Sequence, residues 1–327
     1  MHNHKFRITA NFLNNSSQEY FVIKILFVCS GNIFRSVTVE LCLKQYLQEN
    51  KIRGFQISST GTRAHKEPMR PELANLMQSW GLDPQKHVQR KVTKKILAQN
   101  DIVICMADYH QRFLLEKFGK SAQLYFDILR GKPNNLLDIE DVVPRLKTNK
   151  EIANHVKKTA RFIKFQTPQL FKAINKKYLL FLQFEKGKRA EFDGLPYIPL
   201  IKSKKSIAFM SRDIPPRHPF HVLIIPKKLY THIDDIPLDV QTDMLALVKK
   251  IGRISYLQAD GYNVLINSGL AAGQNIYHTH IHVIPRKYND GIRIELWKHR
   301  LANKRSFAKL NKQLQYSLEC WKSSRKR

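Results

Sequence analysis

The chain of 327 residues has an ordinary hydrophobic share, 43%, and is long enough for two domains that each bury a core. Its 56 Lys and Arg outnumber 26 Asp and Glu, and the formal net charge of +30 would attract phosphates, nucleic acid or acidic surfaces. Four cysteines without a Cys-x-x-Cys pair exclude a disulfide-stapled or zinc-ribbon fold and favour a reducing, cytoplasmic setting. We expect no membrane span and no targeting segment, because the apolar stretches are short.

The first predicted elements are a polar extension, a strand, a loop and a helix. Residues 1–20 are polar, and we expect them to form a loosely ordered extension. The apolar, β-branched run Phe21–Val28 predicts a buried strand, and Val37–Leu47 has helical spacing. Gly31 and Asn32, in the loop between them, tolerate unusual backbone angles. A strand, a tight loop and a helix together direct backbone N–H groups towards an anion.

This loop carries Cys29 at its start, with Arg35 and Ser36 at its end. A thiolate next to a helix N-terminus and an arginine is a nucleophile, and the Ser36 hydroxyl can hydrogen-bond to it. The five residues between Cys29 and Arg35 can wrap their amides around a phosphoryl group, which Arg35 can clamp with two hydrogen bonds. The alternative is a buried structural thiol, which is how most free cysteines behave.

Short apolar strands then alternate with helix-like segments. We expect strands at Gln56–Ser59 and Ile102–Met106, and helices at Pro71–Trp80, Lys91–Asn100 and Glu151–Phe165. This alternation predicts an α/β domain with a parallel sheet and helices on both faces. Ligands of such sheets bind at the carboxyl ends of the strands, where the loop after the first strand lies.

Four segments share the pattern of one known family: CSGNIFRS at Cys29–Ser36, ISSTGT at Ile57–Thr62, GLDPQKHVQRKV at Gly81–Val92 and DIVICM at Asp101–Met106. They resemble the low-molecular-weight protein tyrosine phosphatases, over residues 21–175. The resemblance implies that Cys29 attacks the phosphorus of a phosphorylated protein or a small phosphomonoester, with no metal or other cofactor.

The same resemblance implies which residues hold the phosphoryl group. They are Arg35, Ser36 and the loop residues Ser30, Gly31, Asn32, Ile33 and Phe34. The chain departs from the family pattern at Phe34, where a second cysteine is usual, and at Val37, where a proline is usual. Ile33 favours phosphotyrosine over phosphoarginine, because threonine at that position is typical of the arginine phosphatases.

A general acid is needed for the leaving oxygen, and later a base for water. In the resembled family an Asp-Pro pair on a late loop has this role, and here the loop at 127–146 is rich in Asn, Pro and Asp. The register LDIEDVVP makes Asp141 the candidate, although Val142 replaces the proline. Asp138 is the second choice and Asp127 the third. An acidic loop that only contacts solvent is the alternative.

A second domain is expected after a boundary near Asn175, and Pro168 is expected to break the helix before that boundary or to start a new element. Helix-like Asp235–Ala259 is followed by a strand at Tyr262–Asn267, a Gly-containing loop, and a strand through IYHTHIHVIPR that ends at Arg286.

Because strand side chains alternate, His278, His280 and His282 are expected on one face. Such a face suits a phosphate. The same face would suit a metal if His221 supplied a fourth nitrogen. A third interpretation is a strand with histidines on its surface and no ligand.

The segment NSGLAAGQNIYHTHIHVIPR, and the earlier Asp213–Lys228 with its VLIIPKK, resemble the histidine-triad nucleotide hydrolases and transferases over roughly 195 to 290. The resemblance implies an antiparallel sheet and His280 as the nucleophile on a nucleotide α-phosphate. His278 and His282 would orient His280 and neutralise the charge of the phosphate.

The remaining residues of that implied site contact the nucleotide. They are Asp213 at the ribose, His221, Asn267, Gly273, and Asn275, which stands where one branch has a serine beside the leaving group. The resemblance implies a nucleotide or nucleoside phosphoramidate as substrate, and allows a homodimer through this domain.

From Arg286 onward the chain is basic, and five apolar residues fall near helical spacing: Phe307, Leu310, Leu314, Leu318 and Trp321. A basic amphipathic helix of this kind can contact a membrane or nucleic acid. We expect instead that its apolar stripe docks on the chain's own domains.

We therefore predict a polar extension (1–20), a parallel-sheet α/β phosphatase domain (21–175), an α+β histidine-triad domain (176–295) and a basic helical tail (296–327). The expected function is bifunctional: phosphomonoester hydrolysis through Cys29, and nucleotide hydrolysis or transfer through His280. One alternative is a regulatory or nucleotide-sensing protein with one degenerate site. The other, a nucleic-acid-binding protein, rests on charge alone.

Overall fold

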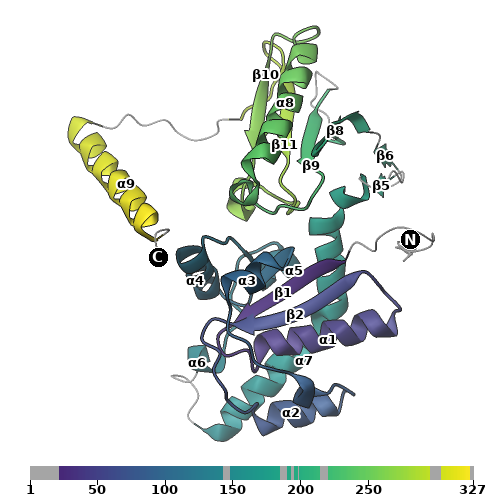
Figure 1. Ribbon diagram of the computed structural model, residues 1–327, viewed down its shortest axis with the longest axis vertical. Helices are drawn as coiled ribbons and strands as arrows, with labels where there is room; N and C mark the ends of the chain where they lie inside the picture. Colours follow the sequence, from purple (N-terminus) through teal and green to yellow (C-terminus); the bar gives the residue numbers. More distant parts are fainter. Residues whose placement is uncertain are drawn as a thin grey trace.

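The computed structural model contains two sheets of different kind, connected by a long helix (Figure 1). It describes residues 22–142, 148–184, 190–192, 195–197, 199–213, 220–294 and 303–324. The predicted polar extension lies outside these residues. None of the helices within the described ranges combines the length and the apolar character that crossing a membrane requires.

The N-terminal sheet is parallel throughout, as predicted. Within the described residues it has the strand order β2-β1-β3-β4. Its strands are β1 (Ile23–Cys29), β2 (Phe55–Gly61), β3 (Ile102–Cys105) and β4 (Gln123–Leu124). The central strand β1 is fully buried from Ile25 to Val28, which explains its run of apolar residues.

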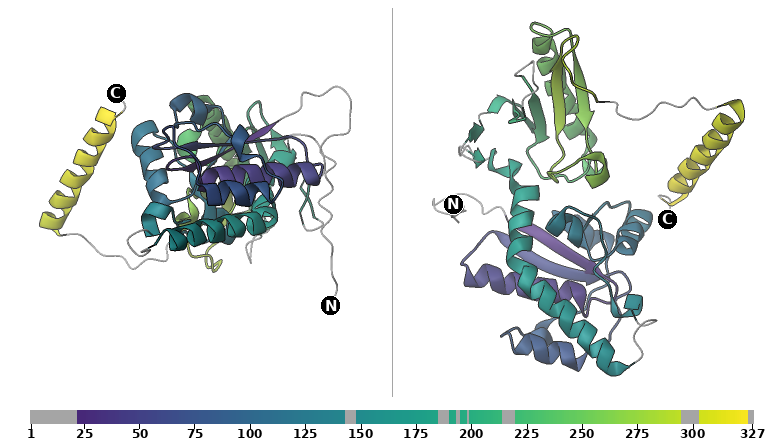
Figure 2. Two further views of the ribbon diagram at one scale, coloured as in Figure 1. Left: turned by 90° about the horizontal axis from the view of Figure 1, so that it is seen from below. Right: turned by 180° about the vertical axis from the view of Figure 1, so that it is seen from behind.

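Helices cover both faces of this sheet (Figures 1 and 2). They are α1 (Arg35–Glu49), α2 (Pro71–Gln78), α3 (Lys94–Ala98), α4 (Asp108–Phe118), α5 (Tyr125–Arg130), α6 (Ile139–Val142) and α7 (Asn149–Ile174), with a 3-10 turn η1 (Pro84–Lys86). Ile25 and Phe27 of β1 pack with α1, α5 and α7 on one face. Leu26 and Val28 pack with α3 and α4 on the other. The α/β prediction is confirmed.

The helix α7 is longer than predicted and runs through Pro168. It starts with a capping box, in which Glu151 N–H donates to Thr148 Oγ1 at 3.2 Å and Thr148 N–H donates to Glu151 Oε2 at 2.9 Å. The expectation that Pro168 breaks the helix is wrong. Ile163 and Leu170 on its apolar face are fully buried against the sheet, and this packing outweighs the lost backbone hydrogen bond.

The second sheet is antiparallel, in the order β10-β11-β9-β8-β7 within the described residues. Its strands are β7 (Pro199–Lys202), β8 (Ser206–Met210), β9 (Val222–Pro226), β10 (Gly261–Ile266) and β11 (Ile281–Arg286). One face packs on α8 (Leu238–Ser255). Short turns η5 (Ile233–Asp235) and η6 (Leu270–Ala272), and the separate pair β5 (Ala190–Phe192) and β6 (Leu195–Tyr197), complete this α+β unit.

One predicted strand is shorter than expected. β11 begins at Ile281, so His278 and His280 lie before the strand and only His282 lies in it. The expected strand alternation therefore does not place the three histidines. The backbone N–H groups of this segment bond outside the sheet. Tyr277 N–H donates to the carbonyl of Lys177 at 2.6 Å, and Thr279 N–H donates to the carbonyl of Tyr230 at 2.7 Å. These two backbone hydrogen bonds hold the segment that carries His278 and His280.

The helix α7 continues into the second domain. A π-helical turn, η3 (Asn175–Leu179), and a 3-10 turn, η4 (Phe181–Phe184), follow it. Tyr178 and Leu179 belong to the core cluster of the N-terminal sheet, and so do Leu229 and Tyr277 from the second half of the chain. Leu180 and Phe181 instead pack against β8 and β9. The two domains are therefore joined through a shared core at this junction.

The basic tail forms a separate helix, α9 (Lys304–Ser324). It stands apart from both domains in all three views (Figures 1 and 2). Its apolar residues Phe307, Leu310, Leu314 and Leu318 are exposed, so the expected docking of this stripe on the chain's own domains is not seen.

Candidate active sites

The loop between β1 and α1 is held in a tight curve by Asn32 and by a glycine of β2. Asn32 has a left-handed backbone conformation, with φ of 59°. Its side-chain amide donates to Ser36 Oγ at 3.1 Å and to Ser59 Oγ at 2.7 Å. Gly61 leaves room for the curve, because a Cβ there would lie 2.3 Å from the carbonyl oxygen of Ser30. The loop is therefore preshaped around its centre.

Cys29 is buried at the end of β1, and its sulfur faces hydrogen-bond donors. The N–H of Asn32 donates to Cys29 Sγ at 3.2 Å, and Ser36 Oγ lies 2.9 Å from the sulfur. Because the side-chain amide of Asn32 already donates to Ser36 Oγ, the hydroxyl proton of Ser36 is free to point at the sulfur. The first amides of α1, which begins at Arg35, add the positive end of a helix. These contacts all stabilise a thiolate.

Two other described cysteines have different surroundings. Cys42 and Cys105 are buried and free of disulfide bonds, and they pack among apolar side chains. Burial raises the pKa of the Cys42 thiol to about 12 and also raises that of Cys105. Both thiols are therefore inert packing groups, and among these three cysteines the donor-lined position belongs to Cys29.

The Arg35 side chain is fully buried beneath the loop. Its guanidinium donates to the carbonyl of Leu136 at 2.7 Å and to Ser30 Oγ and Tyr109 OH at 3.2 Å each, and it pairs with Asp138. Burial alone would lower its pKa, but Asp138 and the sulfur of Cys29 raise it above the ordinary value. Arg35 Nε has no partner among the described residues, and this donor is available to a phosphoryl oxygen.

Asp138 and Asp141 both reach the loop, and they differ in their partners. The Asp138 carboxylate pairs directly with Arg35. Asp141 Oδ2 lies 4.0 Å from Arg35 Nη1 and accepts from Tyr109 OH at 3.2 Å and from the Asp138 N–H at 2.7 Å. Its side chain is 26% exposed, against 14% for Asp138. Asp127 has its contacts at Leu124 and near Lys177, at the domain junction. Asp141 is the carboxylate with better access to a leaving group.

His110 and Tyr109 also belong to this site, and the sequence did not single them out. The N–H of Ala107 donates to His110 Nδ1 at 3.1 Å, so His110 Nε2 carries the proton and donates to Ser30 Oγ at 3.1 Å. Burial and the charge of Arg35 lower the pKa of His110 to about 2, which keeps the ring neutral. Tyr109 and His110 lie just after β3, at the carboxyl edge of the sheet. This position was the sequence signal that could have identified them as site residues.

The second candidate site lies where β9 and β11 meet. His282 of β11 stacks on His221, which precedes β9, with ring centroids 5.1 Å apart. The ring of His280 lies 4.8 Å from that of His282. His278 is fully buried beneath them, and its Nε2 donates to the carbonyl of Pro226 at 2.9 Å. The structure therefore brings together all four predicted histidines.

The hydrogen bonds define the protonation of His280. Its Nδ1 donates to the carbonyl of His278 at 2.8 Å, so Nε2 carries a lone pair. Burial lowers the pKa of His280, and lowers that of His278 to about 4 and that of His282 to about 3. Neutral imidazole is the nucleophilic form. His280 therefore presents an unprotonated Nε2.

His221 and His282 form a chain that ends near Asp213. His221 Nδ1 donates to the Asp213 carbonyl at 2.6 Å, so its Nε2 accepts from His282 Nδ1 at 2.9 Å. His282 Nε2 then has no partner among the described residues. The Asp213 side chain is exposed, and residues 214–219, which follow it, lie outside the described residues.

The predicted nucleotide contacts lie on the loop beside the histidines. Gly273 has a left-handed φ of 85°, and a Cβ there would lie 3.6 Å from the Asn267 amide nitrogen. Asn275 is exposed at the end of this loop. Gln274, which the sequence did not single out, is fully buried and closes the loop with two backbone hydrogen bonds of 2.7 Å.

Phe181 of η4 is a further component of the histidine site. Its ring centroid lies 5.5 Å from that of His280, 5.9 Å from that of His278 and 5.4 Å from that of Phe209. Phe181 thus packs against the nucleophile from the segment that joins the domains. The run around it is uniformly apolar, so the sequence held no signal for this role.

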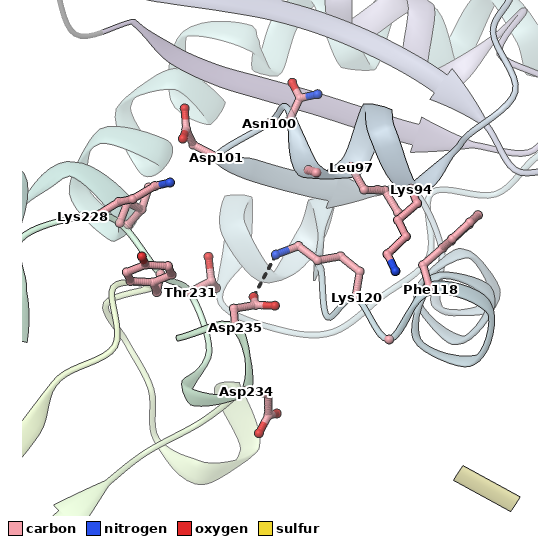
Figure 3. A pocket seen from close by; sticks show the side chains of 14 residues that line it. Lys94, Leu97, Asn100, Asp101, Phe118, Lys120, Lys228, Thr231, Asp234 and Asp235 are labelled. Carbon is pink, nitrogen blue, oxygen red and sulfur yellow. Dashed lines mark hydrogen bonds and ion pairs between the residues drawn. The ribbon is translucent and has the colours of Figure 1, made fainter. Parts of the chain in front are cut away.

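The two domains also meet around a cavity of about 390 Å³ (Figure 3). Lys120 after α4 pairs with Asp235 of η5 at 2.9 Å across this interface. Gln123 of β4 bonds to His232 Nε2 at 2.7 Å, and His232 Nδ1 lies 3.1 Å from Ser268 Oγ, next to the nucleotide loop. The cavity lining mixes lysines and aspartates, so its charge indicates no particular ligand.

The described residues contain no group of three or more His, Cys, Asp or Glu side chains arranged to hold a metal ion. In the histidine cluster, ring nitrogens of His221, His278 and His280 bond to backbone carbonyls. These bonds fix which ring nitrogen of each of the three histidines carries the proton.

Comparisons with known proteins agree with this division. Residues 24–179 match the family model of low molecular weight phosphotyrosine protein phosphatases, and residues 197–289 match that of the HIT domain. The adenosine 5′-monophosphoramidase HNT1 of Saccharomyces cerevisiae is 35% identical over 125 residues, which are 38% of this chain and 77% of that protein.

Two more relatives represent the two halves. An uncharacterized HIT-like protein of Methanocaldococcus jannaschii is 38% identical over 98 residues, 30% of this chain and 74% of that protein. The structure of a YwlE arginine phosphatase from Geobacillus stearothermophilus is 17% identical, covers 52% of this chain and 99% of that chain, and has a TM-score of 0.39.

Proposed function

Since the chain belongs to the histidine-triad family through residues 197–289 and carries a low-molecular-weight phosphatase domain at 24–179, we propose that it is a bifunctional hydrolase. One site hydrolyses phosphomonoesters through a phosphocysteine. The other hydrolyses or transfers nucleotides through a nucleotidyl-histidine. Each proposal rests chiefly on the hydrogen bonds around its nucleophile.

The phosphatase proposal starts from the donors that face Cys29. The Cys29 thiolate attacks phosphorus, the bond from phosphorus to the leaving oxygen breaks, and Asp141 protonates that oxygen. The loop amides and Arg35, with its unpartnered Nε, stabilise the equatorial oxygens as charge spreads over them. Water, deprotonated by Asp141, then attacks the phosphocysteine and releases inorganic phosphate. The half-buried Asp138 holds Arg35 in this position.

Iodoacetate tests this proposal directly. We expect it to alkylate Cys29 near neutral pH, to abolish hydrolysis of an aryl phosphate, and to be slowed by inorganic phosphate, which occupies the loop. Cys42 and Cys105 serve as internal controls, because their buried thiols should stay unmodified. Full phosphatase activity of the alkylated protein would contradict the role of Cys29.

The substrate class that we propose for this site rests on one residue of the loop between β1 and α1. We propose phosphotyrosine-type esters, from Ile33 at the position that distinguishes the arginine phosphatases. Parallel assays with a phosphotyrosine peptide and a phosphoarginine peptide separate the two classes. A higher kcat/KM on phosphoarginine would reverse this assignment and leave the Cys29 mechanism intact.

The nucleotide proposal starts from the hydrogen bond between His280 Nδ1 and the His278 carbonyl. His280 Nε2 attacks the α-phosphate, and the amine or phosphate leaving group departs. Water then releases the nucleoside monophosphate from Nε2. The substrate class we propose is a nucleoside phosphoramidate or a related nucleotide, since HNT1 is an adenosine 5′-monophosphoramidase.

A trapped intermediate tests the nucleotide proposal. After mixing with an adenosine phosphoramidate and rapid denaturation at alkaline pH, peptide mapping should find adenylate on His280. Adenylate on His278 or His282, or turnover retained by His280→Ala, would assign the nucleophile differently. If only one of the two activities is found, the other domain is better interpreted as a ligand sensor.

We also propose that the protein acts in the cytoplasm and pairs with a second copy through the histidine-triad domain. The strand β10 lies at one edge of its sheet and Val264 on it is 41% exposed, which suits a strand-to-strand contact. Light scattering after size exclusion should give twice the mass of the chain. A monomer at micromolar concentration would contradict this pairing.

A further inference from the structure

The helix α9 has one continuous apolar face that neither domain covers. Phe307, Leu310, Leu314 and Leu318 follow one another at intervals of three or four residues, so they share one side of the helix. They are 66%, 58%, 62% and 49% exposed. At 1.5 Å per residue the helix is about 31 Å long, and the apolar face from Phe307 to Leu318 extends over about half of it.

The side of α9 opposite the apolar face carries basic residues. From residue 303 to the end of the printed sequence, the basic residues are Lys304, Arg305, Lys309, Lys312, Lys322, Arg325, Lys326 and Arg327. The acidic residue in this stretch is Glu319. On a helical projection, Arg305, Lys309 and Lys312 lie away from the apolar face. The helix is therefore amphipathic and strongly cationic.

We propose that α9 binds the surface of an anionic lipid bilayer, with the helix lying in the plane of the interface. Such a surface matches both properties of the helix: acyl chains accept Phe307 and the leucines, while anionic headgroups attract the lysines and arginines. A nucleic acid would match the charge but leave the apolar face in water. The net charge of +30 adds long-range attraction to the same surface.

The polarity of α9 excludes insertion across the bilayer, because it is not apolar enough to span one. Peripheral binding instead places the apolar face at the boundary between headgroups and acyl chains. The residues between α9 and the second domain, 295–302, lie outside the described residues, and the proposal does not depend on them.

Co-sedimentation of the full chain with lipid vesicles tests the proposal. We expect binding to vesicles of phosphatidylcholine with phosphatidylglycerol, and about tenfold weaker binding to vesicles of phosphatidylcholine alone. The variant Leu310→Gln/Leu314→Gln should weaken binding to the anionic vesicles by about tenfold or more. Ala308→Gln, which introduces the same side chain off the apolar face, is the matched control and should bind normally.

Charge and folding are controlled separately. Lys309→Gln/Lys312→Gln should weaken binding to anionic vesicles and leave the residual binding to neutral vesicles unchanged. All variants should keep both enzymatic activities in solution, since α9 contacts neither site. Failure of the full chain to bind anionic vesicles would overturn the proposal. So would equal binding by Leu310→Gln/Leu314→Gln, which would indicate a purely electrostatic contact such as one with RNA.

Discussion

Cys29 and His280, the two nucleophiles that we propose, have opposite surroundings. Around Cys29, the Asn32 N–H, the Ser36 hydroxyl and the cation of Arg35 all favour negative charge. Around His280, burial and neighbouring rings disfavour positive charge, and a backbone carbonyl orients the proton. In the function that we propose, the first site therefore holds a phosphoryl group with a fixed cation, whereas the second attacks with a neutral imidazole. A single chain thus uses charge in one domain and the exclusion of charge in the other.

Removing each nucleophile in turn is the strongest test of this comparison. His280→Ala should lower nucleotide turnover by about a thousandfold or more, and should change aryl-phosphate turnover by only a few-fold. Cys29→Ser should give the reverse pattern. Steady-state kinetics on both substrates checks this. If His280→Ala also abolishes the phosphatase activity, the two nucleophiles belong to one composite site.

A smaller effect is expected from the proton donor of the first site. Asp141→Asn should lower kcat about a hundredfold for a phosphoester with a poor leaving group, and far less for an activated aryl phosphate. Asp138→Asn should instead weaken phosphate binding, because it releases Arg35 from its ion pair. Measuring kcat and KM against the pKa of the leaving group separates these outcomes. A steeper leaving-group dependence in Asp138→Asn would exchange the two roles.

The buried histidines should also make stability depend on pH. Unfolded histidine titrates near pH 6.5, whereas burial lowers the pKa of His278 to about 4 and that of His282 to about 3. Between these values the unfolded chain binds more protons, so stability is full above pH 6.5 and falls on acidification. We expect a loss on the order of 1–3 kcal/mol between pH 7 and pH 5.

Urea unfolding at several pH values measures this dependence. His278→Asn should flatten it, because the substituted side chain does not titrate. His65→Asn is the control: the Arg63 carbonyl and Glu67 raise the pKa of the exposed His65, so its loss should not flatten the slope. A stability that rises on acidification would contradict the neutral state of the cluster.

The smallest effect we expect is at the wall of the histidine site. Phe181→Ala should lower kcat for the nucleotide about three- to tenfold, because His280 loses a packing neighbour, and should leave aryl-phosphate turnover unchanged. Phe165→Ala, at a 72% exposed position of α7, is the matched control. Equal kcat values for the two variants would show that Phe181 is not a positioning residue.

The parts of each site that the sequence could predict are close together in the chain. Cys29 to Ser36 and His278 to His282 are short segments whose spacing already carries the chemistry. The contacts that the sequence could not predict join distant residues. Arg35 reaches Leu136 and Asp138 more than a hundred positions away, and Phe181 reaches His280 from the segment that joins the domains. Such pairs depend on how helices and strands pack, which residue pattern alone does not encode.

The parallel sheet and its alternating helices were predictable because apolar runs and helical spacing repeat along residues 21–175. The strand through His278 was not, because its backbone bonds to Lys177 and Tyr230 instead of a neighbouring strand. Pro168 was misjudged for a similar reason: the buried face of α7 stabilises a helix that the local sequence disfavours.

The shared core has a consequence for the order in which the protein is made. Translation delivers β1 to α7 first, but the aromatic partner of Tyr178 is Tyr277, whose ring lies 5.2 Å away. While the ribosome adds the intervening residues, Tyr178 at the end of the first domain lacks this partner ring. The nascent phosphatase domain therefore presents an apolar surface that is buried only when synthesis reaches the histidines.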